Sequence, residues 1–151
     1  MRVTGVTGKA LLKLSLFGLL ATAFVVQAKD TVPYKSTVSG KITYTDTGAF
    51  IEETGIATHL GNFTLSGATD ADGIMWMTIT AANKDTLLAV VVYVSESMDT
   101  VKILVYGGTG RFENATGDIT AHLTITSVEM PSIYYTATGT GTITTVGASK
   151  R

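Results

Sequence analysis

The chain has 151 residues, a length typical of one domain, and it contains no cysteine. The absence of cysteine excludes disulfide bonds, zinc–thiolate sites, iron–sulfur clusters and cysteine nucleophiles. With 11 basic and 12 acidic residues the formal net charge is −1. Because a nucleic-acid-binding surface needs clustered positive charge, we expect no nucleic acid partner.

The first 28 residues have the pattern of a secretory signal peptide. Three basic residues precede an apolar run from Leu14 to Val26, and Val26-Gln27-Ala28 places small residues before a cleavage site. The alternative is an uncleaved membrane anchor, but a bilayer span takes about 20 apolar residues in a row. The run here is shorter. We therefore predict a signal peptide over residues 1–28, a secreted or periplasmic location, and one domain over residues 29–151.

The mature chain has the pattern of an all-β domain. Residues 29–33 are interpreted as a leader. From there on, short Thr- and Val-rich runs alternate with Gly-, Asp- and Asn-rich turns. The connections are short, which favours an antiparallel sheet, and about eight strands are enough to close a small barrel. A β-sandwich is the structural alternative. The expected strands cover residues 36–45, 50–53, 55–65, 74–82, 86–94, 101–106, 118–127 and 133–145.

The most unusual stretch is the glycine-rich segment from Tyr106 to Gly117. Phosphate-binding glycine loops lead into a helix whose N-terminus faces the anion. Here the glycines lead to Phe112 and then to a strand. We therefore interpret the segment as a structural turn that Phe112 anchors in a core, and not as a binding site.

Residues 105–117, VYGGTGRFENATG, resemble the signature of the dirigent and allene-oxide-cyclase-like barrel proteins. The matching positions are Gly107, Gly108, Thr109, Gly110 and Phe112, and Ala115 and Gly117 continue the pattern. Residues 57–64 and 81–87 resemble bacterial secreted members of that superfamily. The resemblance implies an eight-stranded antiparallel barrel whose lumen can hold a small apolar molecule.

Characterised members of the superfamily cyclise a fatty-acid epoxide or steer the coupling of phenoxy radicals. In both reactions the barrel mainly fixes the conformation of a reactive ligand. Their catalytic residues lie outside the glycine motif and match no position of this chain, so none is carried over.

Three residues are candidate ligand contacts. His59 shares an expected strand face with Phe63, so we expect both side chains to point into the barrel. His59 is also the candidate catalytic residue, as an acid or base, although a hydrogen-bonded structural histidine has the same pattern. Trp76 alternates with Met75 and Met77, and the sequence does not decide which of these faces lines the lumen.

The other polar residues predict no metal or cofactor. Glu52 and Glu53 are adjacent, so a strand points them to opposite faces and they form no carboxylate dyad. Asp70 and Asp72 lie in a turn too short for an EF-hand. His122 lies on a threonine-rich face, where we expect it to be solvated.

The leading functional prediction is an exported barrel that binds a small hydrophobic molecule without turnover. One alternative is an isomerase, a cyclase or a radical-coupling guide that acts by orienting its ligand. Another is a cell-surface structural module that self-associates into a homo-oligomer. A membrane-embedded barrel is disfavoured, because the last strand has threonine on one face and mostly Ala and Gly on the other, without a lipid-facing apolar row.

Overall fold

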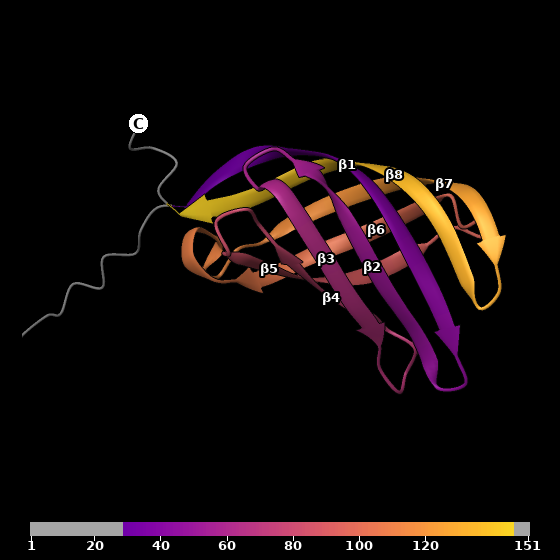
Figure 1. Ribbon diagram of the computed structural model, residues 1–151. Helices are drawn as coiled ribbons and strands as arrows, with labels where there is room; N and C mark the ends of the chain where they lie inside the picture. Colours follow the sequence, from indigo (N-terminus) through magenta and orange to yellow (C-terminus); the bar gives the residue numbers. More distant parts are fainter. Residues whose placement is uncertain (1–28, 147–151) are drawn as a thin grey trace, which may run out of the picture.

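The computed structural model describes residues 29–146, which form a single closed barrel of eight antiparallel strands (Figure 1). Each strand pairs with its neighbours in sequence, and β1 pairs with β8 to close the barrel. The predicted all-β barrel is confirmed, and the sandwich alternative is wrong. The predicted signal peptide lies outside the described residues. The strands are β1 (Lys29–Thr45), β2 (Gly48–Ala57), β3 (Gly61–Thr69), β4 (Met75–Thr80), β5 (Thr86–Val94), β6 (Thr100–Gly108), β7 (Gly117–Glu129) and β8 (Ser132–Val146).

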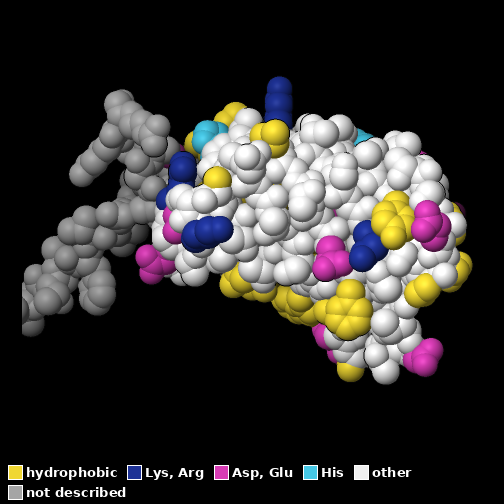
Figure 2. Space-filling view, viewed as in Figure 1, with side chains coloured by type: hydrophobic (Ala, Val, Ile, Leu, Met, Phe, Trp, Pro, Cys, Tyr) yellow, Lys and Arg dark blue, Asp and Glu magenta, His cyan; other side chains and the backbone are white. Residues whose placement is uncertain are grey.

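The barrel has two different ends. We call the end formed by the connections 46–47, 70–74, 95–99 and 130–131 the mouth. We call the opposite end the base; it holds the connections 58–60, 81–85 and 109–116, together with the start of β1 and the end of β8. Much of the outer wall between the two ends carries neither charged nor hydrophobic side chains in the space-filling view (Figure 2). Exposed threonines on the strands, among them Thr54, Thr64, Thr136 and Thr138, contribute to this surface.

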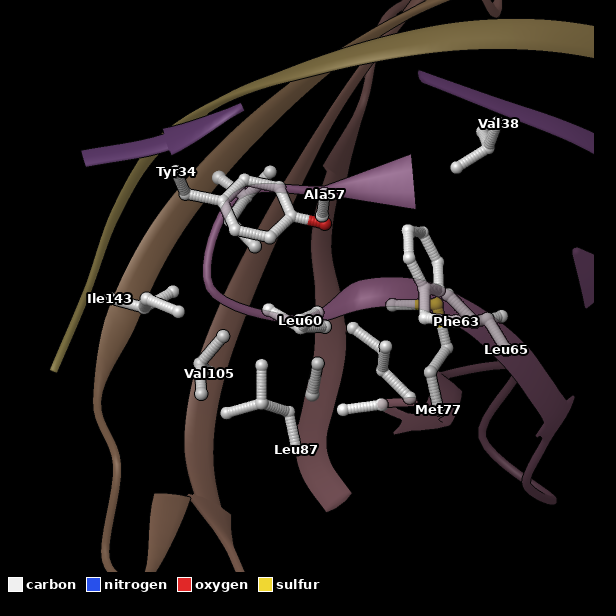
Figure 3. Close-up of a cluster of buried hydrophobic side chains, with 14 of the residues drawn as sticks. Tyr34, Val38, Ala57, Leu60, Phe63, Leu65, Met77, Leu87, Val105 and Ile143 are labelled. Carbon is white, nitrogen blue, oxygen red and sulfur yellow. The ribbon is translucent and has the colours of Figure 1, made fainter. Parts of the chain in front are cut away.

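Apolar side chains close the base. Leu60, Leu87, Val105, Phe112 and Ile143 are all at most 4% exposed and belong to one hydrophobic cluster. Leu60, Leu87, Val105 and Ile143 lie beside Phe63 and Met77 in the same cluster (Figure 3). Because these side chains fill the lumen at the base, any internal cavity must open toward the mouth.

The glycine-rich segment forms one wall of this base. Phe112, at the end of a short 3₁₀ helix η1 (Gly110–Phe112), is fully buried. A Cβ on Gly108 would lie 2.2 Å from the carbonyl oxygen of Thr86, so only glycine fits there. Gly110 has φ +56° beside the carboxylate of Asp85, and that carboxylate accepts a hydrogen bond from the Arg111 backbone N–H at 3.1 Å. The segment is therefore a packed turn, and the short helix is the one element of it that the sequence did not suggest.

Most strand ends differ from the sequence prediction by a few residues, and two differences are larger. β1 begins at Lys29, because residues that we interpreted as a leader pair with β8. Up to Lys35 this strand pairs with β8 alone, so Pro33 lies on a local edge where proline is tolerated. The expected strand over residues 55–65 is divided by a turn at residues 58–60 between β2 and β3.

Candidate functional site

The barrel encloses a cavity of about 460 Å³. This volume lies within the range of about 300–1,000 Å³ that is typical of small-molecule sites. All eight strands contribute to the lining. Most of the lining is aliphatic or aromatic, including Val38, Ile51, Phe63, Leu65, Met77 and Ile119. An apolar molecule is therefore the natural occupant.

The cavity opens at the mouth of the barrel. Its outermost lining side chains are between 37% and 59% exposed, whereas those deeper in the lumen are buried. We call these outermost residues the rim; they are Tyr44, Ile74, Val92, Tyr93, Val94 and Met98. A ligand can therefore enter from the mouth along apolar surface.

One polar pair lies inside the cavity. The hydroxyl group of Tyr135 on β8 donates a hydrogen bond to Oε1 of Glu53 on β2 at 2.5 Å. The two strands are separated by β1, where Gly40 pairs with Glu53 on one side and with Tyr135 on the other. A Cβ on Gly40 would lie 2.7 Å from the Tyr135 hydroxyl and 2.8 Å from Cγ of Glu53. The missing side chain of Gly40 is thus what lets the pair meet.

Burial changes the acidity of these groups. Burial raises the pKa of Glu53 above its ordinary value, and the hydrogen bond from Tyr135 lowers it only in part. Burial and the charge of Glu53 both raise the pKa of Tyr135. Burial also raises the pKa of Tyr34, and a side-chain hydrogen bond with Ser36 lowers this pKa by a smaller amount. The tyrosines therefore remain hydrogen-bond donors, and the Glu53 carboxyl takes up a proton more readily than one in water.

Glu53 is chemically distinct within this site. Among the described residues that line the cavity there is no Asp, Lys, Arg or His. A carboxyl group in apolar surroundings can hold or release a proton, or accept a hydrogen bond from a ligand. In the sequence, Glu53 stands out only as one half of an adjacent glutamate pair. The signal that points to it is a carboxylate in register with Ile51 and Ala57, on the inward face of β2.

The three predicted ligand contacts lie in different places. Phe63 lines the cavity and is only 5% exposed. The expected inward orientation of His59 is wrong: His59 is exposed in the β2–β3 turn, with φ 66°. The chain reverses there through a bond from the Leu60 backbone N–H to the Ala57 carbonyl oxygen at 3.3 Å. His59 therefore does not line the cavity.

Trp76 lies on the outside of the barrel, where it is 43% exposed. Its Nε1 donates a hydrogen bond to Asp70 at 2.8 Å, and its ring meets that of Tyr106 edge-on at a centroid distance of 5.5 Å. The neighbouring Met75 and Met77 line the cavity instead. The structure thus decides between the two faces of β4: Trp76 is not a cavity residue.

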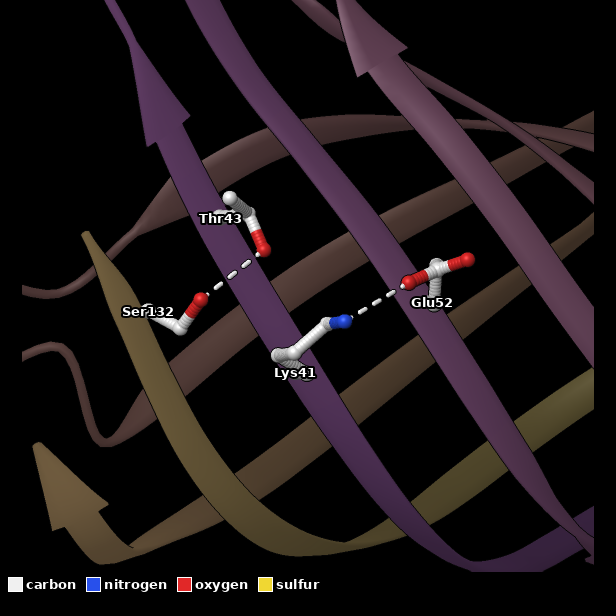
Figure 4. A network of polar contacts seen from close by, with 4 residues as sticks. All are labelled: Lys41, Thr43, Glu52 and Ser132. Atoms are coloured by element: carbon white, nitrogen blue, oxygen red, sulfur yellow. Dashed lines mark hydrogen bonds and ion pairs between the residues drawn. The ribbon is translucent and has the colours of Figure 1, made fainter. Parts of the chain in front are cut away.

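The remaining polar residues are accounted for by local contacts. Glu52 points outward and pairs with Lys41 at 3.1 Å (Figure 4), so the two adjacent glutamates do face opposite ways. Asp70 accepts hydrogen bonds from the backbone N–H groups of Asp72 and Ile74, which organises its turn. His122 is exposed, 3.3 Å from the Thr100 hydroxyl. Within residues 29–146, no group of three or more His, Asp or Glu residues is placed to hold a metal ion.

No helix in residues 29–146 is both long and apolar enough to cross a membrane.

Comparison with known proteins identifies the fold. No family model and no curated protein matches the sequence. Among solved structures, the chain is similar to that of a pterocarpan synthase dirigent protein, with a TM-score of 0.56 and 12% sequence identity. The match covers 82% of this chain and 89% of that chain. At this identity the likeness concerns the fold alone, and it agrees with the resemblance carried by the glycine motif: the chain has the dirigent-like, eight-stranded antiparallel β-barrel fold.

Proposed function

We propose that this protein is an exported barrel that binds one small, largely apolar molecule in its lumen. The observation that carries the proposal is the cavity of about 460 Å³, lined by all eight strands and open at the mouth. Removal of apolar surface from water, at about 25 cal/mol per Å², supplies the binding energy. The exposed apolar rim supplies an entry path that requires no strand to separate.

The test compares filling the cavity with adding the same bulk elsewhere. Ala121 lines the cavity on β7, whereas Ala82 is exposed in a turn at the base. The neutral dye Nile red should become fluorescent with the delipidated wild-type protein and with Ala82→Phe, but its affinity should fall by about tenfold or more with Ala121→Phe. Equal binding by all three proteins would place the dye outside the lumen and would overturn the proposal.

A second candidate function is a guide that orients a reactive ligand. Two observations favour it: the dirigent-like fold, and the single carboxyl group at Glu53 with its Tyr135 partner inside the cavity. The solved structure with a similar fold is that of a pterocarpan synthase dirigent protein. Fixing a ligand in one reactive conformation needs a shaped cavity and few catalytic groups. In this scheme Glu53, and not His59, takes the acid–base role.

Matched variants test the guide hypothesis. If the barrel accelerates or directs a reaction, Glu53→Gln should abolish the effect while Nile red still binds. His59→Ala should leave the reaction unchanged. A reaction that survives Glu53→Gln but is lost in His59→Ala would instead restore the first assignment. The remaining alternative, a structural module that self-associates, is less well supported because the lumen holds a cavity and is not filled by side chains.

Export is a separate part of the proposal. It depends on the basic and apolar pattern of residues 1–28. Mass spectrometry of the protein recovered outside the cytoplasm should give a mature chain that begins at Lys29. A chain that retains Met1 and stays with the membrane fraction would favour the anchor.

A further inference from the structure

We infer that the cavity selects apolar molecules that carry one cationic group, a protonated amine, and that it discriminates against carboxylates of the same shape. This inference names the ligand class of the proposed function and rests on it. It follows from the placement of charge in the lumen, at the mouth and at the base.

The first step concerns the free oxygen of Glu53. Oε1 accepts the hydrogen bond from Tyr135, while the described residues provide no hydrogen bond to Oε2. The carboxyl group lines the cavity, so Oε2 is available to a ligand. An ammonium group donates up to three hydrogen bonds, and its bond to a carboxylate is roughly twice as strong as one between neutral partners.

The second step concerns the countercharge. A carboxylate in an apolar cavity is costly unless an opposite charge compensates it. The ionisable side chains that line the cavity besides Glu53 are tyrosines, namely Tyr34 and Tyr44 on β1, Tyr93 on β5 and Tyr135 on β8. None of these supplies a positive charge. A ligand ammonium group does.

The third step concerns the field at the entrance. The four connections at the mouth carry five acidic residues and no Lys, Arg or His. These residues are Asp46, Asp70, Asp72, Glu96 and Asp99, and Glu129 ends the adjacent strand β7. Against these acidic residues stands Lys102 near the start of β6, whose Nζ lies 5.9 Å from the ring centroid of the rim residue Tyr93, so this end keeps a negative excess. Asp and Glu side chains are visible at the end of the barrel away from the grey residues in Figure 2. Such a field raises the local concentration of cations and repels anions.

The base has no such bias. Its three connections carry Lys84 and Arg111 against Asp85 and Glu113, so their charges balance. The excess of negative charge is therefore specific to the end where the cavity opens. An anionic ligand would meet repulsion first at the mouth and then at Glu53.

The experiment uses three ligands with one apolar body: naphthylethylamine, naphthylethanol and naphthylpropionate. Their affinities are measured by calorimetry at neutral pH with the wild type and two variants. Glu53→Gln keeps an oxygen that can accept the Tyr135 bond. Glu52→Gln removes the same charge one residue away, on the outer wall, and so controls for general attraction between the ligand and an acidic protein.

For the wild type and for Glu52→Gln, we expect the amine to bind about tenfold or more tightly than the alcohol, and the carboxylate to bind more weakly than both. For Glu53→Gln the amine should lose its advantage, so that the amine and the alcohol bind with equal affinity. Equal affinities in the wild type, or an amine preference that survives in Glu53→Gln, would overturn the inference. If the alcohol and Nile red bind but the amine has no advantage, the proposed function stands and only this inference fails. If none of the probes binds, both fail.

Discussion

Tyr135 reaches Glu53 across an entire intervening strand. The two residues lie on β8 and β2, and the residue of β1 between them is Gly40. Any larger side chain at this position would occupy the space through which the tyrosine hydroxyl passes. The hydrogen-bonded pair inside the cavity therefore depends on the absence of a side chain at position 40.

The first prediction concerns this glycine. Gly40→Ala should break the Tyr135–Glu53 bond, since the new Cβ would overlap both side chains. Overpacking of this kind typically costs about 1–3 kcal/mol in the free energy of unfolding. Urea denaturation measures the loss, and Ser39→Ala, on the exposed outer face of the same strand, should cost much less. A Gly40→Ala protein as stable as the Ser39→Ala control would show that the pair can separate without cost.

The second prediction concerns the dependence of stability on pH. A carboxyl group whose pKa is higher in the folded state than in the unfolded chain binds its proton more tightly when folded. Its contribution to stability is present below the ordinary pKa of 4.5 and is lost as pH rises through the raised value. The wild type should therefore lose stability relative to Glu53→Gln as pH increases from 4.5 toward neutrality. The difference in free energy of unfolding between the two proteins should shift in favour of Glu53→Gln over this range.

Urea denaturation at a series of pH values measures this difference. Glu52→Gln, on the outer wall, serves as the control and should track the wild type in this pH range. The lowered pKa values of Asp70 and Asp99 act in the opposite sense, below their ordinary value of 3.8, so they do not interfere. A constant difference between Glu53→Gln and the wild type would mean that Glu53 is not desolvated.

The third prediction concerns the hydrogen bond itself. Tyr135→Phe removes a donor that lowers the pKa of Glu53, so this pKa should rise further. At neutral pH the variant should lose about 1–3 kcal/mol in the free energy of unfolding, because a buried acceptor is left without its partner. Tyr134→Phe removes a hydroxyl from the neighbouring residue, which is 37% exposed, and should be nearly neutral. Equal stability of the two variants would contradict the prediction.

Period-two alternation in the sequence was enough to predict the barrel, but not the turn that carries His59. A three-residue connection joins Ala57 to Gly61, which are paired and both face inward. Because three is odd, residues 57, 61 and 63 keep the same parity on both sides of the turn. The alternation therefore continues without a break, and the pattern assigns His59 to the same face as Ala57 and Phe63. Gly61, with φ +69°, marks the point at which the chain reverses.

The Glu53–Tyr135 pair was out of reach for a different reason. Its partners are 82 residues apart in the chain, and they meet only through the register of β1 with β2 and with β8. A register shift of one residue would turn one side chain outward. Alternation in a sequence shows which face a residue occupies, but not the row in which it lies across a barrel.

The last prediction concerns fluorescence as a reporter of the cavity. Trp76 is the only tryptophan of the chain, and it lies outside the barrel against Asp70 and Tyr106. Its emission should therefore stay constant when cyclohexylethanol, an uncoloured apolar alcohol, occupies the lumen. A double variant with Trp76→Phe and Phe63→Trp moves the single tryptophan to a buried position that lines the cavity. Its emission should shift on addition of the alcohol, and it should be shielded from acrylamide.

Thermal unfolding of the double variant, with and without the alcohol, provides the control, because it detects binding independently of the fluorophore. If the melting temperature rises while the emission of the tryptophan at position 63 stays constant, the alcohol binds outside the lumen. If the emission of Trp76 in the wild type changes instead, the ligand lies on the outer wall of β4 and β6, where Trp76 and Tyr106 meet. Parallel titrations of the wild type and the double variant thus distinguish an internal site from an external one.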